Sequence, residues 1–136
     1  MRYLPPFTSL WVTLVLLGAT GSTLSAQGPS PRSEADLRAF YQRSCSGCHG
    51  QDGSATATDG RKLKGRDFTS ERDMQGTTDQ GLAKTIRKGL FFGMAMPAYK
   101  GELSEEEALL LVRSILRKAR KGEPIQTPSS TMAKSR

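Results

Sequence analysis

Several residue types that commonly build protein sites are scarce in this sequence. The 136 residues include one histidine, two cysteines and one tryptophan. Separated cysteine or histidine pairs, the usual ligands of structural zinc, are therefore lacking, as is the cysteine density of a disulfide-stapled domain. No apolar run reaches the roughly 20 residues that a spanning helix needs. No strand-like alternation is long enough to predict a sheet.

The longest apolar run lies near the N-terminus, at residues 10–19. It follows Arg2 and precedes small and polar residues that end at Ser25 and Ala26, as in a secretory signal peptide. We therefore expect residues 1–26 to be a signal peptide that directs export to the periplasm or an equivalent extracytoplasmic compartment. A retained membrane anchor is the alternative, although the run is about half the length of a spanning helix.

The rest of the chain divides into a folded centre and two polar ends. Residues 27–32 and 122–136 are rich in Ser, Thr and Pro, so we expect a flexible linker and a disordered tail. The folded domain is expected over residues 33–121, enough for one small core. The formal net charge of +7 favours partners with acidic surfaces. Because basic and aromatic residues are not interleaved, we expect no nucleic-acid partner.

Two of three expected helices are predicted from their caps and apolar spacing. The first is expected over residues 34–44, behind the N-cap Ser33. The second is expected over residues 79–88, where Thr77 and Gln80 have the spacing of a capping box. A short helical turn near residues 70–74 is a weaker prediction.

The third helix has the strongest pattern. Ser104 precedes three glutamates, and a continuous apolar stripe covers residues 108–119. We expect this helix to run until Gly122. The glycine-rich loops at 50–65 and 89–101 lie between the helices, so the sequence predicts a small all-α domain whose loops surround a group that is not protein.

The two cysteines and the histidine occur together in the segment CSGCH, at residues 45–49. Two thiols at this spacing can each add to one vinyl group of haem, and the next residue then points its imidazole at the iron. We predict one covalent haem c on Cys45 and Cys48, with His49 as the proximal iron ligand. A redox-active thiol pair would leave His49 without a role, a zinc site lacks further ligands, and a disulfide at this spacing would be strained.

Methionine sulfur or an open position remains for the other face of the iron, because the sequence has no second histidine. The candidates are Met74, Met94, Met96 and Met132. Met94 and Met96 share a glycine-rich loop that is free to fold over the ring, and Pro97 stiffens the chain directly after Met96.

With these features the chain resembles the class I c-type cytochromes. The CSGCH segment follows an amphipathic helix, Met-Pro-Ala occurs later at residues 96–98, and Leu-Ser-Glu-Glu-Glu at residues 103–107 opens the last helix. The resemblance spans residues 33–121. It implies a small cytochrome c-like fold of three main helices around one covalently bound haem.

Carried over to this chain, the resemblance implies that Met96 is the distal iron ligand, with Met94 as the alternative. It also implies that Tyr41 packs between the first helix and the haem. The family often has a proline after the haem motif whose carbonyl orients the proximal histidine, but no proline lies between His49 and Met96. The orienting partner of His49 is therefore left open.

The expected function is one-electron transfer, in which the protein positions and tunes its cofactor and performs no bond chemistry of its own. Redox proteins with acidic docking surfaces are the expected partners. A gas-binding, sensing or peroxidase-like haem protein is the alternative if the sixth iron position is open. A cytochrome subunit of a larger oxidoreductase is the other alternative.

Overall fold

The computed structural model describes residues 31–126, which form a small all-α domain. Its α-helices are α1 (Glu34–Ser44), α2 (Ser46–His49), α3 (Glu71–Met74), α4 (Asp79–Lys88) and α5 (Glu105–Ser114), and two 3-10 turns cover Phe91–Gly93 and Leu116–Lys118. Between residues 31 and 126, β-type pairing is limited to isolated bridges. In the same range no helix combines the length and apolar character needed to cross a bilayer. The predicted all-α fold is confirmed.

Reciprocal capping boxes start α1 and α5 at the predicted residues. The Ser33 hydroxyl accepts from the Asp36 N–H, and the Asp36 carboxylate accepts from the Ser33 N–H. Ser104 and Glu107 make the same pair of bonds at α5. Each box satisfies backbone donors that the first helical turn leaves free, which fixes where the helix begins.

The start of α4 corrects the sequence prediction. Its N-cap is Thr78, whose hydroxyl accepts from the Gly81 N–H at 3.0 Å. The Thr77 hydroxyl instead donates to the carbonyl of Met74, at the end of α3. No capping box forms, because Gly81 stands at the third helical position and has no side chain to return the bond.

The last helix is shorter than predicted. The α-helical geometry of α5 ends at Ser114, Ile115 departs from it with φ −122° and ψ −63°, and a 3-10 turn follows. This tighter turn keeps Ile115 buried while Arg117 reaches Asp79 with an Nε–Oδ1 distance of 3.0 Å. The expected continuation to Gly122 is therefore wrong. The earlier end of the helix is accompanied by the ion pair between Arg117 and Asp79 of α4.

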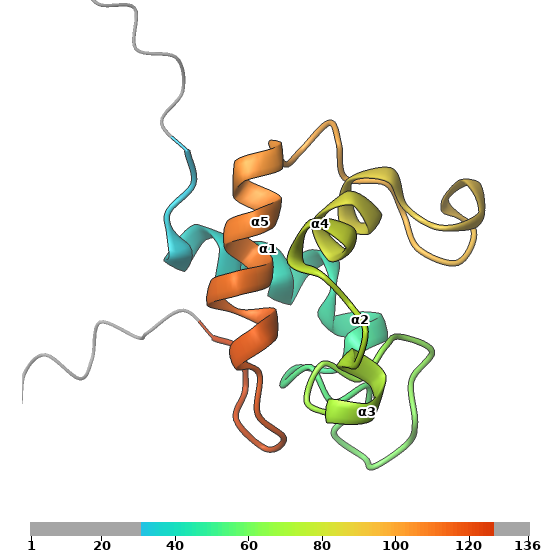
Figure 1. The fold of residues 1–136 in the computed structure, drawn as a ribbon. Helices are drawn as coiled ribbons and strands as arrows, with labels where there is room; N and C mark the ends of the chain where they lie inside the picture. The colour runs from blue at the N-terminus through green and yellow to red at the C-terminus, as the bar shows by residue number, and fades with distance from the viewer. Residues whose placement is uncertain (1–30, 127–136) are drawn as a thin grey trace, which may run out of the picture.

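The core lies where α5 crosses α1 and runs beside α4 (Figure 1). The largest fully buried side chains are Tyr41, Phe40, Leu37, Leu103, Leu111, Ile115 and Val112. Tyr99 joins them from the loop before α5, with its ring edge-on to Phe40 at a centroid distance of 5.4 Å. Burial of each such apolar side chain contributes about 1.5–3 kcal/mol relative to leaving it exposed.

Both ends of the described range pack onto the domain. The Arg32 N–H donates to the Glu107 carboxylate at 2.9 Å. Ile125 is buried, and its N–H donates to the carbonyl of Gln51 at 2.8 Å. The packed part of the chain thus extends past residues 33–121 in both directions. The expected signal peptide, the rest of the linker and the tail from residue 127, which includes Met132, lie outside the described residues.

Candidate functional site

The CSGCH segment occupies the end of α1 and the single turn of α2. Cys45 ends α1, and its carbonyl accepts from the N–H groups of Cys48 and His49 at 3.1 and 2.9 Å. This tight turn gathers two thiols and an imidazole on one short stretch of backbone. Neither cysteine forms a disulfide. Burial raises the pKa of the Cys45 thiol to about 12, so that thiol is uncharged at neutral pH.

Two tyrosines of the core hold this turn in place. The buried Tyr41 hydroxyl donates to the Gly50 carbonyl at 2.8 Å, and the Tyr99 hydroxyl donates to the Ser44 carbonyl at 2.9 Å. Burial raises the pKa of Tyr41, which keeps its hydroxyl protonated as a donor. Tyr99 follows shortly after Met96, so the hydrogen bond from its hydroxyl also ties the loop that contains Met96 to Ser44, the residue before Cys45.

The ring of His49 has a defined orientation. Its Nδ1 lies 3.0 Å from the carbonyl oxygen of Arg66. A carbonyl only accepts, so Nδ1 carries the hydrogen and donates it, and Nε2 keeps its lone pair for a metal. Burial lowers the pKa of His49, which favours the same neutral form. Arg66 is therefore the orienting partner that the sequence left open.

The two candidate methionines have different surroundings. Met96 is partly buried and packs, like Cys45, against the hydrophobic core, whereas Met94 is 84% exposed. Backbone pairing fixes Met96, because its carbonyl accepts from the Leu90 N–H at 3.0 Å. Gly89 allows this approach, since a Cβ there would lie 2.5 Å from that same carbonyl oxygen. Of the two, Met96 is the one with a fixed position.

The donor set fits a covalently attached haem. It supplies two free thiols on one turn, an imidazole with an available Nε2, and a thioether on a loop tied to that turn. In the described part of the chain, no three His, Cys, Asp or Glu side chains converge to hold a metal ion, so the zinc alternative lacks its ligands there. The alternative of a redox-active thiol pair, as in thioredoxin-like folds built on a β-sheet, lacks that sheet in the same residues.

Gly65 also contacts the motif, although the sequence analysis assigned it no role. Its N–H donates to the Cys48 carbonyl at 2.8 Å. A Cβ at this position would lie 2.4 Å from the Cys48 oxygen and 2.6 Å from His49 Nδ1, so only glycine fits. The sequence feature that could have pointed to Gly65 is its position within a run of basic residues, at 61–66.

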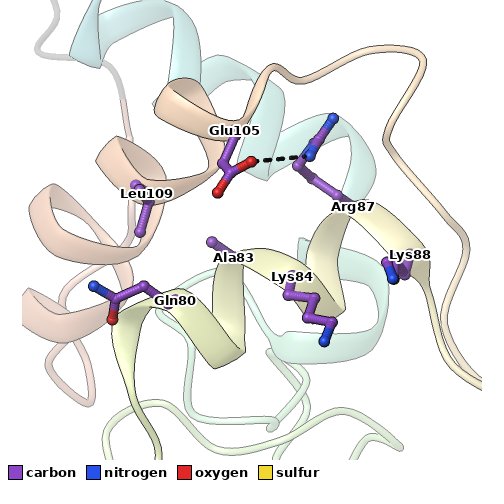
Figure 2. Close-up of a pocket in the computed structure, with 7 residues that line it drawn as sticks. All are labelled: Gln80, Ala83, Lys84, Arg87, Lys88, Glu105 and Leu109. Carbon is purple, nitrogen blue, oxygen red and sulfur yellow. Dashed lines mark ion pairs between the residues drawn. The ribbon is translucent and has the colours of Figure 1, made fainter.

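A shallow groove of about 290 Å³ lies between α4 and α5, outside this site (Figure 2). It is lined by Gln80, Ala83, Lys84, Arg87, Lys88, Glu105 and Leu109. An ion pair of 3.6 Å between Arg87 and Glu105 crosses its edge. None of the predicted haem or iron ligands lines it, and its character is cationic because Lys84 and Lys88 border it.

Comparison with known proteins identifies related sequences and structures. The family described as cytochrome C oxidase, cbb3-type, subunit III matches residues 32–113, more than half of the 136-residue chain. The structure of the KustC0563 c-type cytochrome is 27% identical, with a TM-score of 0.47 over 62% of this chain and 96% of that one. A tyrosine-to-phenylalanine mutant of the same cytochrome is 28% identical, with a TM-score of 0.49 over 62% and 99%. No curated protein matches.

Proposed function

The chain belongs to the family of cytochrome C oxidase, cbb3-type, subunit III, and we propose that it is a one-electron carrier. The c-type cytochrome domains of this family carry covalent haem c. Bound haem supplies an iron that exchanges between ferrous and ferric states. The polypeptide holds the group, tunes it and keeps water and oxygen from the iron. The protein catalyses no bond chemistry by itself.

We propose that Cys45 and Cys48 hold the haem as thioethers, that His49 Nε2 is the proximal iron ligand and that Met96 sulfur is the distal one. The observation that carries the last assignment is the contrast between the packed, backbone-paired Met96 and the exposed Met94. With both axial positions filled, the iron has no open site for a gas or a peroxide. A thioether ligand raises the reduction potential, as in carriers of this ligand type.

The visible and near-infrared spectrum of the ferric holoprotein tests this ligation. We expect a weak red charge-transfer band from methionine sulfur to iron, which Met96→Ala abolishes and Met94→Ala leaves unchanged. Loss of the band in Met94→Ala alone would move the ligand to Met94. A wild-type protein without the band, whose ferrous form readily binds carbon monoxide, would instead support the gas-binding or peroxidase-like function.

We propose further that redox partners with acidic surfaces dock beside the loop that carries Met96. Residues 84–101 contain four basic residues and no acidic one. Lys84, Lys88 and Lys100 are exposed and make no ion pair with a described carboxylate, whereas Arg87 is paired with Glu105. The loop between them exposes the side chains of Leu90, Phe91, Phe92 and Met94. An apolar centre with a cationic rim suits a transient acidic partner.

Electron-transfer kinetics with a small acidic redox protein test this docking site. In the double variant Lys88→Glu, Lys100→Glu we expect the bimolecular rate constant at low salt to fall about tenfold or more. The matched control is Lys62→Glu, Lys64→Glu, which makes the same change of net charge in another exposed loop. Equal losses in both double variants would show that only net charge matters.

We also propose that residues 1–26 direct export and that the mature protein works in the periplasm or an equivalent compartment. The support is the sequence pattern, an apolar run behind Arg2 and before small residues. Intact mass of the protein recovered from the extracytoplasmic fraction tests both parts. We expect loss of the N-terminal segment together with the added mass of one haem, whereas a retained N-terminus in a membrane fraction would support the anchor.

A further inference from the structure

Besides its carbonyl contact, the imidazole of His49 makes a second contact that the proposed function does not use. The ring of Phe68 lies against it, with a centroid distance of 4.6 Å and an angle of 18° between the planes. The hydrogen bond from Nδ1 to Arg66 fixes one point of the imidazole but leaves it free to swing about the N–O axis. A flat ring on its face removes that remaining freedom.

One short segment delivers both contacts. Gly65 bonds to the Cys48 carbonyl at one end, and at the other the Phe68 N–H donates to the Gly53 carbonyl at 2.8 Å. Between these anchors the Arg66 guanidinium donates to the carbonyl of Asp73, at α3. The segment is thus attached to the haem motif, to the following loop and to α3, which makes it a rigid support.

Phe68 is itself held in place. Its side chain is partly buried and packs against the hydrophobic core. A Cβ added to Gly53 would lie 3.5 Å from the edge of its ring, so the loop backbone lies close beside it. The ring therefore has little freedom to follow the imidazole, and the imidazole must adopt the plane that Phe68 offers.

We propose that Phe68 is a positioning residue for the proximal iron ligand, which sets the plane of the His49 imidazole by stacking on it while the Arg66 carbonyl sets its direction. The proposal rests on the proposed ligation of iron by His49. No proline lies between His49 and Met96. Instead, residues 65–68 supply the carbonyl that orients His49, from Arg66, and add the ring of Phe68.

Paramagnetic NMR of the ferric holoprotein tests this proposal, because the order of the haem-methyl resonances depends on the plane of the axial imidazole. We expect Phe68→Leu, which keeps an apolar side chain but no flat face, to lose the wild-type order and to shift the reduction potential. Phe68→Tyr, which keeps the ring, should retain both. Leu109→Ala is the control, because Leu109 packs against the same core from α5.

The outcomes separate a positioning role from packing and from a failure of the proposed function. If Phe68→Leu and Leu109→Ala both lower the melting temperature and both keep the wild-type order, Phe68 is only a packing residue and the proposal is wrong. If Phe68→Leu fails to incorporate haem, Phe68→Ile replaces it as the apolar variant without a flat face, and the wild-type order of the resonances in that variant would refute the proposal. A wild-type protein without an imidazole ligand on iron would refute the proposed ligation itself.

Discussion

At the scale of single residues, the hydroxyl of Tyr41 gives a direct test of how the haem motif is held. This side chain is fully buried, and it donates to the Gly50 carbonyl at 2.8 Å. Tyr41→Phe removes this donor and leaves the Gly50 carbonyl with only the longer bond from the Gly53 N–H, at 3.3 Å. We expect the free energy of unfolding of the holoprotein to fall by about 0.5–1.5 kcal/mol, with haem content unchanged.

Urea unfolding followed by far-ultraviolet circular dichroism measures this loss. Tyr99→Phe is the comparison, because the hydroxyl of Tyr99 donates to Ser44 from a side chain that is less deeply buried. Its loss should be smaller, since water can reach the freed carbonyl more easily. Equal stability of Tyr41→Phe and wild type would mean that the bond to Gly50 contributes nothing.

Single residues also show how much of the site can be predicted from the sequence. Cys45, Cys48 and His49 stand next to one another in the chain, so their chemistry can be predicted from their spacing. The partner of His49 is a backbone carbonyl, 17 residues further along the chain, and every residue type carries that group. Its identity depends on the path of the chain after the motif, which no side-chain pattern in the sequence reveals.

At the scale of elements, local signals located the helices well, and the structure differs from the prediction at the N-cap of α4 and at the end of α5. The bounds of α1 and α4 agree with the prediction, because caps and apolar spacing act within a few residues. The end of α5 depends instead on Arg117 meeting Asp79, which is 38 residues away. The N-cap of α4 moved from Thr77 to Thr78 because Thr77 is tied to α3.

The cap of α5 gives a prediction at this scale. The Ser104 hydroxyl accepts from the Glu107 N–H at 3.1 Å, and α5 supplies much of the core. Ser104→Ala should lower the free energy of unfolding by about 1 kcal/mol, whereas Ser104→Asp should keep most of the stability because it can still cap. Thermal unfolding measures both. Ser114→Ala, at the other end of α5, should change little; an equal loss there would contradict a capping role for Ser104.

At the scale of the whole molecule, a chain with a formal net charge of +7 uses its few carboxylates as structural acceptors. The Ser33 hydroxyl lowers the pKa of Asp36, the Arg117 and Arg113 guanidiniums lower that of Asp79, and the Ser104 and Arg32 N–H groups lower that of Glu107. Burial opposes ionisation of Asp52, but hydrogen bonds from Gly122 and Ser54 outweigh it and lower its pKa as well. These bonds join Arg32, the starts of α1, α4 and α5, the segment after α5 and the loop after the haem motif.

These lowered pKa values predict the acid response of the fold. A carboxyl whose pKa is lower in the folded state stabilises the fold above its unfolded pKa, and this contribution is lost as the pH falls through the folded pKa. With ordinary values of 3.8 for Asp and 4.5 for Glu, stability should be level above about pH 5 and fall steeply below about pH 4. Urea midpoints measured between pH 3 and 7, about the span of these titrations, follow this loss.

Asp52 is the carboxylate to vary, because it ties the segment after α5 to the loop after the haem motif, with the Gly122 N–H donating to it at 2.7 Å. Asp52→Asn should lower the urea midpoint at neutral pH and should lose less stability on acidification than wild type. Asp59→Asn is the matched control, since the bonds of the Asp59 carboxylate are exposed and local, an ion pair with the Arg61 side chain and a hydrogen bond from the Arg61 N–H. An acid profile of Asp52→Asn that parallels wild type would mean that carboxylates elsewhere in the chain govern acid unfolding. The bond to Gly122 would then hold the segment after α5 without contributing to the pH dependence of stability.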